Sequence, residues 1–403
     1  MTGGHILRPG LALCPTGRIW RRPWLRIVED EIAEIGEGDP PQNSNGASVK
    51  ERPESILLPG FVNSHTHLAL TPLAGCLEPT TDFWQWIADL VALRNTLSDE
   101  AKIEGLREGL SLSLAAGTTT LLDFATAFPP ASPTVIGALR AVEIISFDPS
   151  ECARCMAEWF ALESRFAAPH SVYGTTPELL EMLADQVRRR GGVFTTHLSE
   201  TEDENRLWQL GHSDGTDRHF EHFGVRRPWW QPPRCSPAQF LARLSALDDH
   251  SLLVHCNYLS DGDVELIAAS GANVCVCPAS HRFFGHAPHP LPRLLAAGVN
   301  VCLGTDSLAS SPTLSMWEQM RIVAQDHPTL EWPLLLSLIT TAGARALRLG
   351  DELGVLTPGA PADLILARAD QGCESAARNP RSLFDGPLSI EEVFIAGESV
   401  HRA

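Results

Sequence analysis

Short apolar runs alternate with amphipathic stretches of helical period between residues 59 and 350. This alternation is typical of repeated βα units that close into a parallel barrel. Eight apolar runs are expected to be its strands, at residues 60–64, 118–123, 141–146, 166–169, 193–196, 251–254, 273–277 and 299–304. The pattern therefore predicts an α/β protein built on a (β/α)₈ TIM-type barrel.

Proline and glycine mark the ends of the predicted helices. The pairs Thr176-Pro177 and Ser236-Pro237 are typical of an N-cap followed by the first helical residue. Glycines stand where four helices should end, at Gly117, Gly192, Gly271 and Gly298.

The two ends of the chain show a different sequence pattern, in which short predicted strands are separated by turns. Residues 25–28 and 32–35 flank a polar turn like the arms of a hairpin, and further strands are expected at 354–356, 362–366 and 393–395. We therefore predict one small β domain from residues 1–58 and 351–403, beside a hydrolase barrel at residues 59–350.

Residues 212–237 show no clear period and interrupt the fifth βα unit. Two interpretations stay open, a lid over the barrel mouth or a surface insertion without a part in catalysis.

The composition of the 403 residues, 44% hydrophobic and 20% charged, is ordinary for a globular protein. A net charge of −18 opposes binding to nucleic acid or to anionic membranes, which require a basic surface. No export signal and no apolar run of membrane-spanning length is visible. We expect a cytoplasmic protein with a small-molecule substrate, no nucleic-acid partner and no membrane partner; homo-oligomerisation stays open.

Ten cysteines are scattered along the chain, several of them in strand-like apolar runs. This distribution favours buried thiols over disulfides. Cys152 and Cys155 form one Cys-x-x-Cys pair without a second pair at zinc-finger spacing, so we predict no metal site there.

Residues of metal-ligand type follow several of the predicted strands. His65-Thr66-His67 comes directly after the first strand, where residues i and i+2 point the same way. His197, His255 and Asp306 end strands five, six and eight. Because active sites of such barrels lie at the carboxyl ends of the strands, these five side chains are expected to converge. For any one of these histidines alone, a structural role would be the alternative.

The motifs in this chain resemble the amidohydrolase superfamily, in particular its branch of chlorohydrolases, S-adenosylhomocysteine deaminases and aminofutalosine deaminases. The resemblance rests on PGFVNSHTH (59–67), THLSE (196–200), VHC (254–256) and GTDSLAS (304–310). It extends to DFWQWI (82–87), APHS (168–171), CPAS (277–280) and PGAPADL (358–364), and so covers nearly the whole chain.

The resemblance implies a role for each motif residue. The metal ligands would be His65, His67, His197 and Asp306. The catalytic groups would be Asp306, which takes a proton from the water at the metal, His255, which contacts that water, and Glu200, which shuttles protons.

The resemblance also bears on the number of ions. Binuclear members carry a carboxylated lysine on strand four, whereas the only two lysines here, Lys50 and Lys102, precede strand two. We therefore expect one divalent ion per chain. Zinc is the expected metal, and iron is the alternative.

Substrate contacts are expected from His170, Arg94, Trp86 and Ser307. Phe83, Trp84 and Trp86 could line a pocket for a planar ring, with a place in the core as the alternative for at least one of them. Two positions differ from the family pattern: Leu93-Arg94-Asn95 stands where a ribose-binding glutamate is usual, and His281 where an asparagine is usual.

These groups suit deamination of an aza-aromatic ring. A divalent ion lowers the pKa of its bound water toward about 7, and a carboxyl group can protonate a ring nitrogen and then the departing amine. We predict an aminohydrolase that releases ammonia from an aminated N-heterocycle, with an adenine-type nucleoside such as aminofutalosine as the first substrate. The alternatives are hydrolysis of another C–N or C–halogen bond, as in a guanine-like base or a chlorinated triazine, and a scaffold without catalysis.

Overall fold

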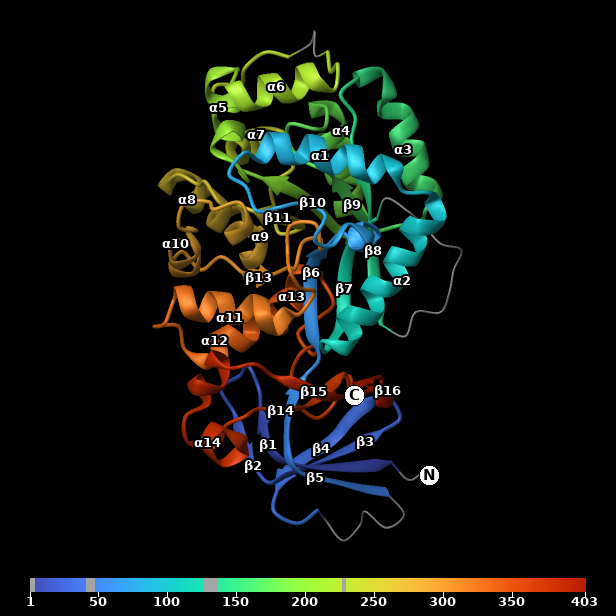
Figure 1. Cartoon of the computed structure of the whole chain (residues 1–403), viewed down its shortest axis with the longest axis vertical. Helices are drawn as coiled ribbons and strands as arrows, with labels where there is room; N and C mark the ends of the chain where they lie inside the picture. Colours follow the sequence, from blue (N-terminus) through green and yellow to red (C-terminus); the bar gives the residue numbers. More distant parts are fainter. Residues whose placement is uncertain (1–3, 41–47, 126–135, 227–229) are drawn as a thin grey trace.

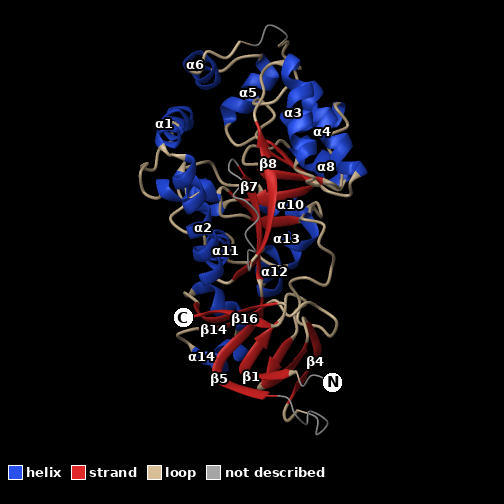
Figure 2. Cartoon of the chain, turned by 90° about the vertical axis from the view of Figure 1, so that its right-hand side faces the viewer, coloured by secondary structure: helices blue, strands red, loops and turns tan. Residues whose placement is uncertain are grey.

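The structure is a computed structural model of the chain and describes residues 4–40, 48–125, 136–226 and 230–403. It contains a barrel of parallel strands surrounded by helices and a second sheet built from both ends of the chain (Figures 1 and 2). Among the residues so described, no helix is long and apolar enough to cross a membrane.

Eight strands follow one another around the barrel in chain order, and each pair of neighbours is parallel. Their bounds are β6 Phe61–Thr66, β7 Thr118–Ala125, β8 Gly137–Ile144, β9 Phe166–Pro169, β10 Val193–Leu198, β11 Ser251–His255, β12 Asn273–Val276 and β13 Val301–Leu303. All eight predicted strands are confirmed, with shifted ends. The β8 strand begins four residues before the predicted run. The prediction missed these residues because they are only partly buried and less apolar.

The barrel closes between β13 and β6 through the residues that follow β13. The backbone amides of Thr305 and Asp306 donate to the carbonyl of His65 at 3.0 and 3.2 Å. Gly304 permits this approach, because a Cβ atom there would lie 2.8 Å from the Cβ of His65. The seam of the barrel therefore lies at its carboxyl rim.

The α-helices are α1 Phe83–Thr96, α2 Asp99–Ala115, α3 Cys152–Ala161, α4 Pro177–Arg189, α5 Glu202–Leu210, α6 Asp214–His222, α7 Pro237–Arg243, α8 Asp261–Ser270, α9 Pro278–Phe283, α10 Leu291–Ala296, α11 Met316–Asp326, α12 Trp332–Leu338, α13 Thr341–Ala346 and α14 Gly372–Arg378. Short 3₁₀ helices span Leu68–Leu73, Pro149–Glu151 and Pro380–Asp385.

The predicted helix ends are confirmed with one change. Thr176 and Ser236 are the N-caps of α4 and α7, and Ser236 forms a capping box. After α4 the residue with positive φ is Gly191 rather than Gly192, whose missing side chain instead makes room for the carbonyl of Arg165.

The terminal sheet has the strand order β16-β15-β14-β5-β1-β3-β4, with β2 paired to β1. Its strands are β1 His5–Leu13, β2 Ile19–Arg21, β3 Pro23–Val28, β4 Glu31–Glu37, β5 Ser48–Pro59, β14 Leu364–Arg368, β15 Ser389–Ile395 and β16 Glu398–Arg402. The hairpin of β3 and β4 and the pairing of both chain ends are confirmed. Only Gly60 separates β5 from β6, and the exact domain borders stay a prediction.

The strand predicted at 354–356 is wrong. This segment is a turn in which Val355 and Leu356 are buried in the core of the terminal sheet. Gly354 has a φ of +83°, which turns the chain away from an extended course. The apolar run therefore reflects burial without strand pairing.

The segment 212–237 contains the helix α6, which the sequence pattern did not predict because its nine residues are mostly polar. α6 packs on α1 above the barrel mouth (Figure 1). Residues 227–229 of this segment lie outside the described residues. All ten cysteines are free thiols, and eight of them are buried, as expected.

Candidate active site

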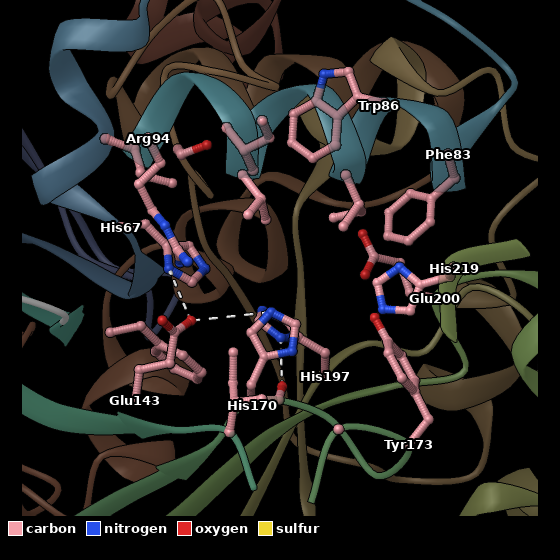
Figure 3. A pocket seen from close by; sticks show the side chains of 18 of the residues that line it. His67, Phe83, Trp86, Arg94, Glu143, His170, Tyr173, His197, Glu200 and His219 are labelled. Atoms are coloured by element: carbon pink, nitrogen blue, oxygen red, sulfur yellow. Dashed lines mark hydrogen bonds and ion pairs between the residues drawn. The ribbon is translucent and has the colours of Figure 1, made fainter. Parts of the chain in front are cut away.

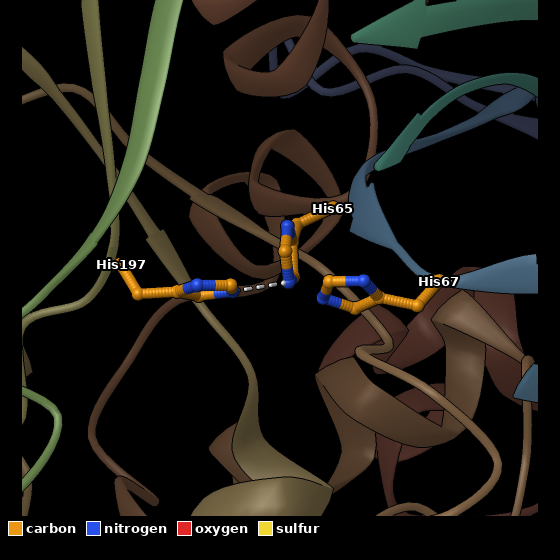
Figure 4. A group of neighbouring side chains, drawn as sticks. All are labelled: His65, His67 and His197. Atoms are coloured by element: carbon orange, nitrogen blue, oxygen red, sulfur yellow. Dashed lines mark hydrogen bonds between the residues drawn. The ribbon is translucent and has the colours of Figure 1, made fainter. Parts of the chain in front are cut away.

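Three histidines form a compact group at the carboxyl rim of the barrel (Figure 4). His65 and His67 come from the end of β6 and His197 from β10, and one ring nitrogen of each lies within 4.8 Å of the others. The Nε2 atoms of His65 and His197 are 3.3 Å apart. Burial lowers the pKa of His65 to about 4 and the pKa of His67 and His197 to about 3, so the rings are neutral. Neutral imidazole is the form that binds a metal ion.

Asp306 adds a carboxylate to this group. Its Oδ1 atom lies 3.8 Å from the Nε2 atoms of both His65 and His67. Burial would raise the pKa of Asp306, but its contacts with His65 and the other nearby imidazoles hold it well below its ordinary value. Three neutral imidazoles and one carboxylate are a donor set that fits a divalent ion such as zinc.

The main chain fixes the orientation of His197. Its Nδ1 atom lies 2.5 Å from the carbonyl oxygen of His170, to which it donates as the Nδ1–H tautomer. The Nε2 atom is therefore left with a lone pair that faces His65.

His255 and Glu200 lie beside the group of three histidines. The Nε2 atom of His255, at the end of β11, is 3.4 Å from Oε1 of Glu200. The ring of His255 is 5.1 Å from the ring of His197 and 5.9 Å from that of His65. Burial, with the nearby Asp306 and Glu204 carboxyls, raises the pKa of Glu200 well above its ordinary value. The arrangement places a proton-carrying carboxyl group at the edge of the ligand set.

Four residues at this rim adopt a strained backbone conformation. Ser199, His255, Cys256 and Asp306 all have positive φ, between +49° and +70°. Non-glycine residues with positive φ are uncommon and gather at functional sites. Of these four side chains, His255 and Asp306 face the site, at the ends of β11 and β13.

A cavity of about 370 Å³ opens beside the ligand group (Figure 3). The four predicted substrate contacts, Trp86, Arg94, His170 and Ser307, all line it. Phe83 lines it too, whereas Trp84 packs in the core with its Nε1 atom donating to Asp203. The structure thus brings the predicted residues together, and their part in binding stays a prediction.

The segment 212–237 contributes to the cavity wall. His219, Phe223 and Val225, in and after α6, line the cavity opposite the barrel rim. The segment thus borders the cavity, and both interpretations, a lid or a surface insertion without a part in catalysis, stay open.

One acidic residue of the cavity was missed by sequence reasoning. Glu143 lies near the end of β8, and its Oε1 atom is 3.9 Å from both Nδ1 of His67 and Nε2 of His170. Burial raises its pKa to about 7. In the sequence, the only indication of this site residue is a single glutamate within the apolar run AVEII at 141–145.

The comparisons with known proteins agree with this geometry. A 5-methylthioadenosine/S-adenosylhomocysteine deaminase of Desulfitobacterium hafniense is 28% identical over 370 residues, covering 86% of this chain and 80% of that protein. An atrazine chlorohydrolase of Arthrobacter aurescens, solved with zinc, superposes with a TM-score of 0.80 at 20% identity, covering 98% of this chain and 94% of that one. For an aminofutalosine deaminase of Helicobacter pylori the TM-score is 0.78 at 19% identity, covering 98% and 100%. The sequence model of the amidohydrolase family matches residues 56–400, and the chain therefore belongs to that family.

Proposed function

We propose that this chain is a metal-dependent aminohydrolase that releases ammonia from an aminated N-heterocycle, with adenine-type nucleosides as its substrates. The observation that carries the proposal is the buried carboxyl of Glu200 beside His255 and the histidine group, at the wall of a largely apolar cavity. Family membership makes the protein a hydrolase of carbon–nitrogen bonds. The deaminase named among its relatives supports the choice of an adenine nucleoside.

His65, His67, His197 and Asp306 would hold the ion, and zinc suits their nitrogen and oxygen donors. A divalent ion held there supplies an acidified water as the nucleophile at neutral pH. The full donor set, together with Glu200, argues against a scaffold without catalysis.

The protein's own groups divide the proton transfers. Asp306 accepts a proton from the attacking water, and His255 orients that water through its ring nitrogen. Glu200 gives its proton to the ring nitrogen next to the carbon under attack. Glu200, now ionised, takes the proton of the newly added hydroxyl group and passes it to the exocyclic amine, so that the ring carbonyl forms, the carbon–nitrogen bond breaks and ammonia leaves. The proton held by Asp306 then returns to Glu200.

A second candidate is hydrolysis of a carbon–halogen bond on a triazine, which the fold likeness to atrazine chlorohydrolase favours. The two reactions differ in the leaving group. Protonation of a ring nitrogen by Glu200 serves both, but a departing chloride needs no proton.

Product analysis on the zinc-loaded protein decides between them. Adenosine, 5′-deoxyadenosine, guanine and atrazine are supplied separately, and ammonia and chloride are measured, with the Glu200→Gln protein as the background. We expect ammonia from the adenine nucleosides. Chloride from atrazine without ammonia from any nucleoside would reject the proposal in favour of the second candidate.

A further inference from the structure

The cavity has two polar ends on either side of the histidine group. Figure 3 shows Glu200 and His219 at one end and Glu143 and Arg94 at the other, with His197 between them. The ring of His170 is 4.7 Å from the ring of His197 and lies on the way to Glu143. A ring whose nitrogen meets Glu200 would therefore direct its far substituent toward Glu143 and Arg94.

Glu143 has unused hydrogen-bonding capacity. Its side chain is only 7% exposed, yet the described part of the chain offers its carboxylate no hydrogen bond, since His67 and His170 stay 3.9 Å away. A buried carboxylate without donors is costly unless a ligand supplies them. The side chain faces the cavity, where a ligand would lie.

Arg94 approaches the same place from the last turn of α1. Its guanidinium lines the cavity, and within the described residues it makes no ion pair and no hydrogen bond. Figure 3 shows its side chain reaching down toward Glu143 from the opposite wall. A donor-only group and an acceptor group thus face one another across this end of the cavity.

We propose that Glu143 and Arg94 form a subsite for a neutral vicinal diol carried by the substituent of the heterocycle. The two hydroxyl groups donate to the carboxylate and accept from the guanidinium. The pair offers acceptor atoms on one side and donors on the other, and a neutral diol, whose hydroxyl groups both donate and accept, can satisfy both groups at once. This inference rests on the proposed function and selects ribonucleosides over free bases and over deoxygenated sugars.

The proposal competes with a structural role in which Glu143 only orients the ring of His67. In that case Glu143→Gln would weaken metal binding and would weaken every substrate equally. A diol subsite predicts unchanged metal content and a loss confined to substrates that carry both hydroxyl groups.

Calorimetric titration of the zinc-loaded Glu200→Gln protein with adenosine and with 2′,3′-dideoxyadenosine separates the two roles. We expect adenosine to bind about ten- to a hundredfold more tightly, the range for charge-assisted hydrogen bonds. Adding Glu143→Gln or Arg94→Met should reduce this preference to about threefold or less. Exposed residues provide the matched controls, Glu181→Gln and Arg107→Met, which should keep the preference.

Equal affinity for the two nucleosides, no binding of either, or a preference that survives both variants would overturn the subsite. So would zinc loss in the Glu143→Gln protein with equal weakening of both ligands. Ammonia release by the unmodified protein tests the proposed function separately. A diol preference without turnover of any nucleoside would reject the function and keep the subsite.

Discussion

The hydroxyl of Ser280 donates to Oδ2 of Asp306 at 2.7 Å, and the hydroxyl of Ser310 approaches the same oxygen at 3.1 Å. These contacts leave Oδ1 turned toward His65 and His67. Groups that hold a ligating carboxylate in place commonly contribute to metal affinity. We therefore expect Ser280 to position Asp306 for metal binding.

Replacing Ser280 by alanine should weaken zinc binding by about 10- to 100-fold while the protein stays folded. The measurement is competition for zinc against a chromophoric chelator. Ser111→Ala, at an exposed position of α2, is the matched control. Unchanged zinc affinity in Ser280→Ala would contradict a positioning role for Ser280.

The protein should bind one divalent ion per chain, held by three imidazoles and one carboxylate. The two lysines, Lys50 and Lys102, lie in β5 and α2, away from the carboxyl end of β9, so neither can bridge a second ion. Elemental analysis of the purified protein measures the ratio. Two tightly held ions, or full activity after exhaustive chelation, would refute the single-ion scheme.

Asp306→Asn and His255→Ala should both reduce turnover by about 10² to 10⁴, the range for a lost general acid or base. They should differ in metal content, because His255 lies beside the ligand group and not within it. His255→Ala should keep its zinc. A His255→Ala protein that purifies without metal would make His255 a ligand.

Glu200→Gln should leave the ion bound and slow the chemical step by about 10² to 10⁴. Glutamine keeps the shape of the side chain but cannot carry a proton between the ring nitrogen and the amine. The loss should appear in kcat more than in substrate affinity, which single-turnover kinetics can separate. Full activity in this variant would remove the main reason to prefer deamination.

A further prediction concerns the terminal sheet, where Glu392 is only 2% exposed and accepts hydrogen bonds from Lys50 and Arg402. Burial alone would raise the pKa of Glu392, but the hydrogen bonds from Lys50, Ser399 and Arg402 lower it below its ordinary value. A lowered pKa in the folded state stabilises the protein above the unfolded pKa of about 4.3, and the gain is lost as the pH falls through the folded value.

Glu392→Gln should therefore reduce the free energy of unfolding by about 1 to 3 kcal/mol at pH 7. The difference from the unmodified protein should shrink as the pH drops below about 4. Denaturant titrations at both pH values measure it, with the exposed Glu398→Gln as control. A difference that does not change with pH would assign the effect to packing and not to charge.

The barrel and the grouping of His65, His67, His197 and Asp306 could be predicted because each depends on local sequence. His65, His197 and Asp306 follow strands whose apolar runs are visible, and the parallel topology brings all strand ends to one rim. Glu143 was missed because its direction depends on the twist of β8 within the closed barrel. The helix α6 was missed because its contacts with α1, rather than an apolar face in its own sequence, keep it in place.

The place where the barrel closes affects which positions of the chain can be substituted during evolution. Thr66 and Asp306, 240 residues apart in the chain, are joined where the first and last strands meet, and these strand ends also carry two of the predicted metal ligands, His65 and Asp306. A substitution of His65 or Asp306 therefore falls at the place where the ring of strands closes. The cavity walls supplied by α1 and α6 lie outside the ring of strands. Substitutions that adapt the cavity to a new substrate can therefore occur in these two helices without changing the closure of the barrel.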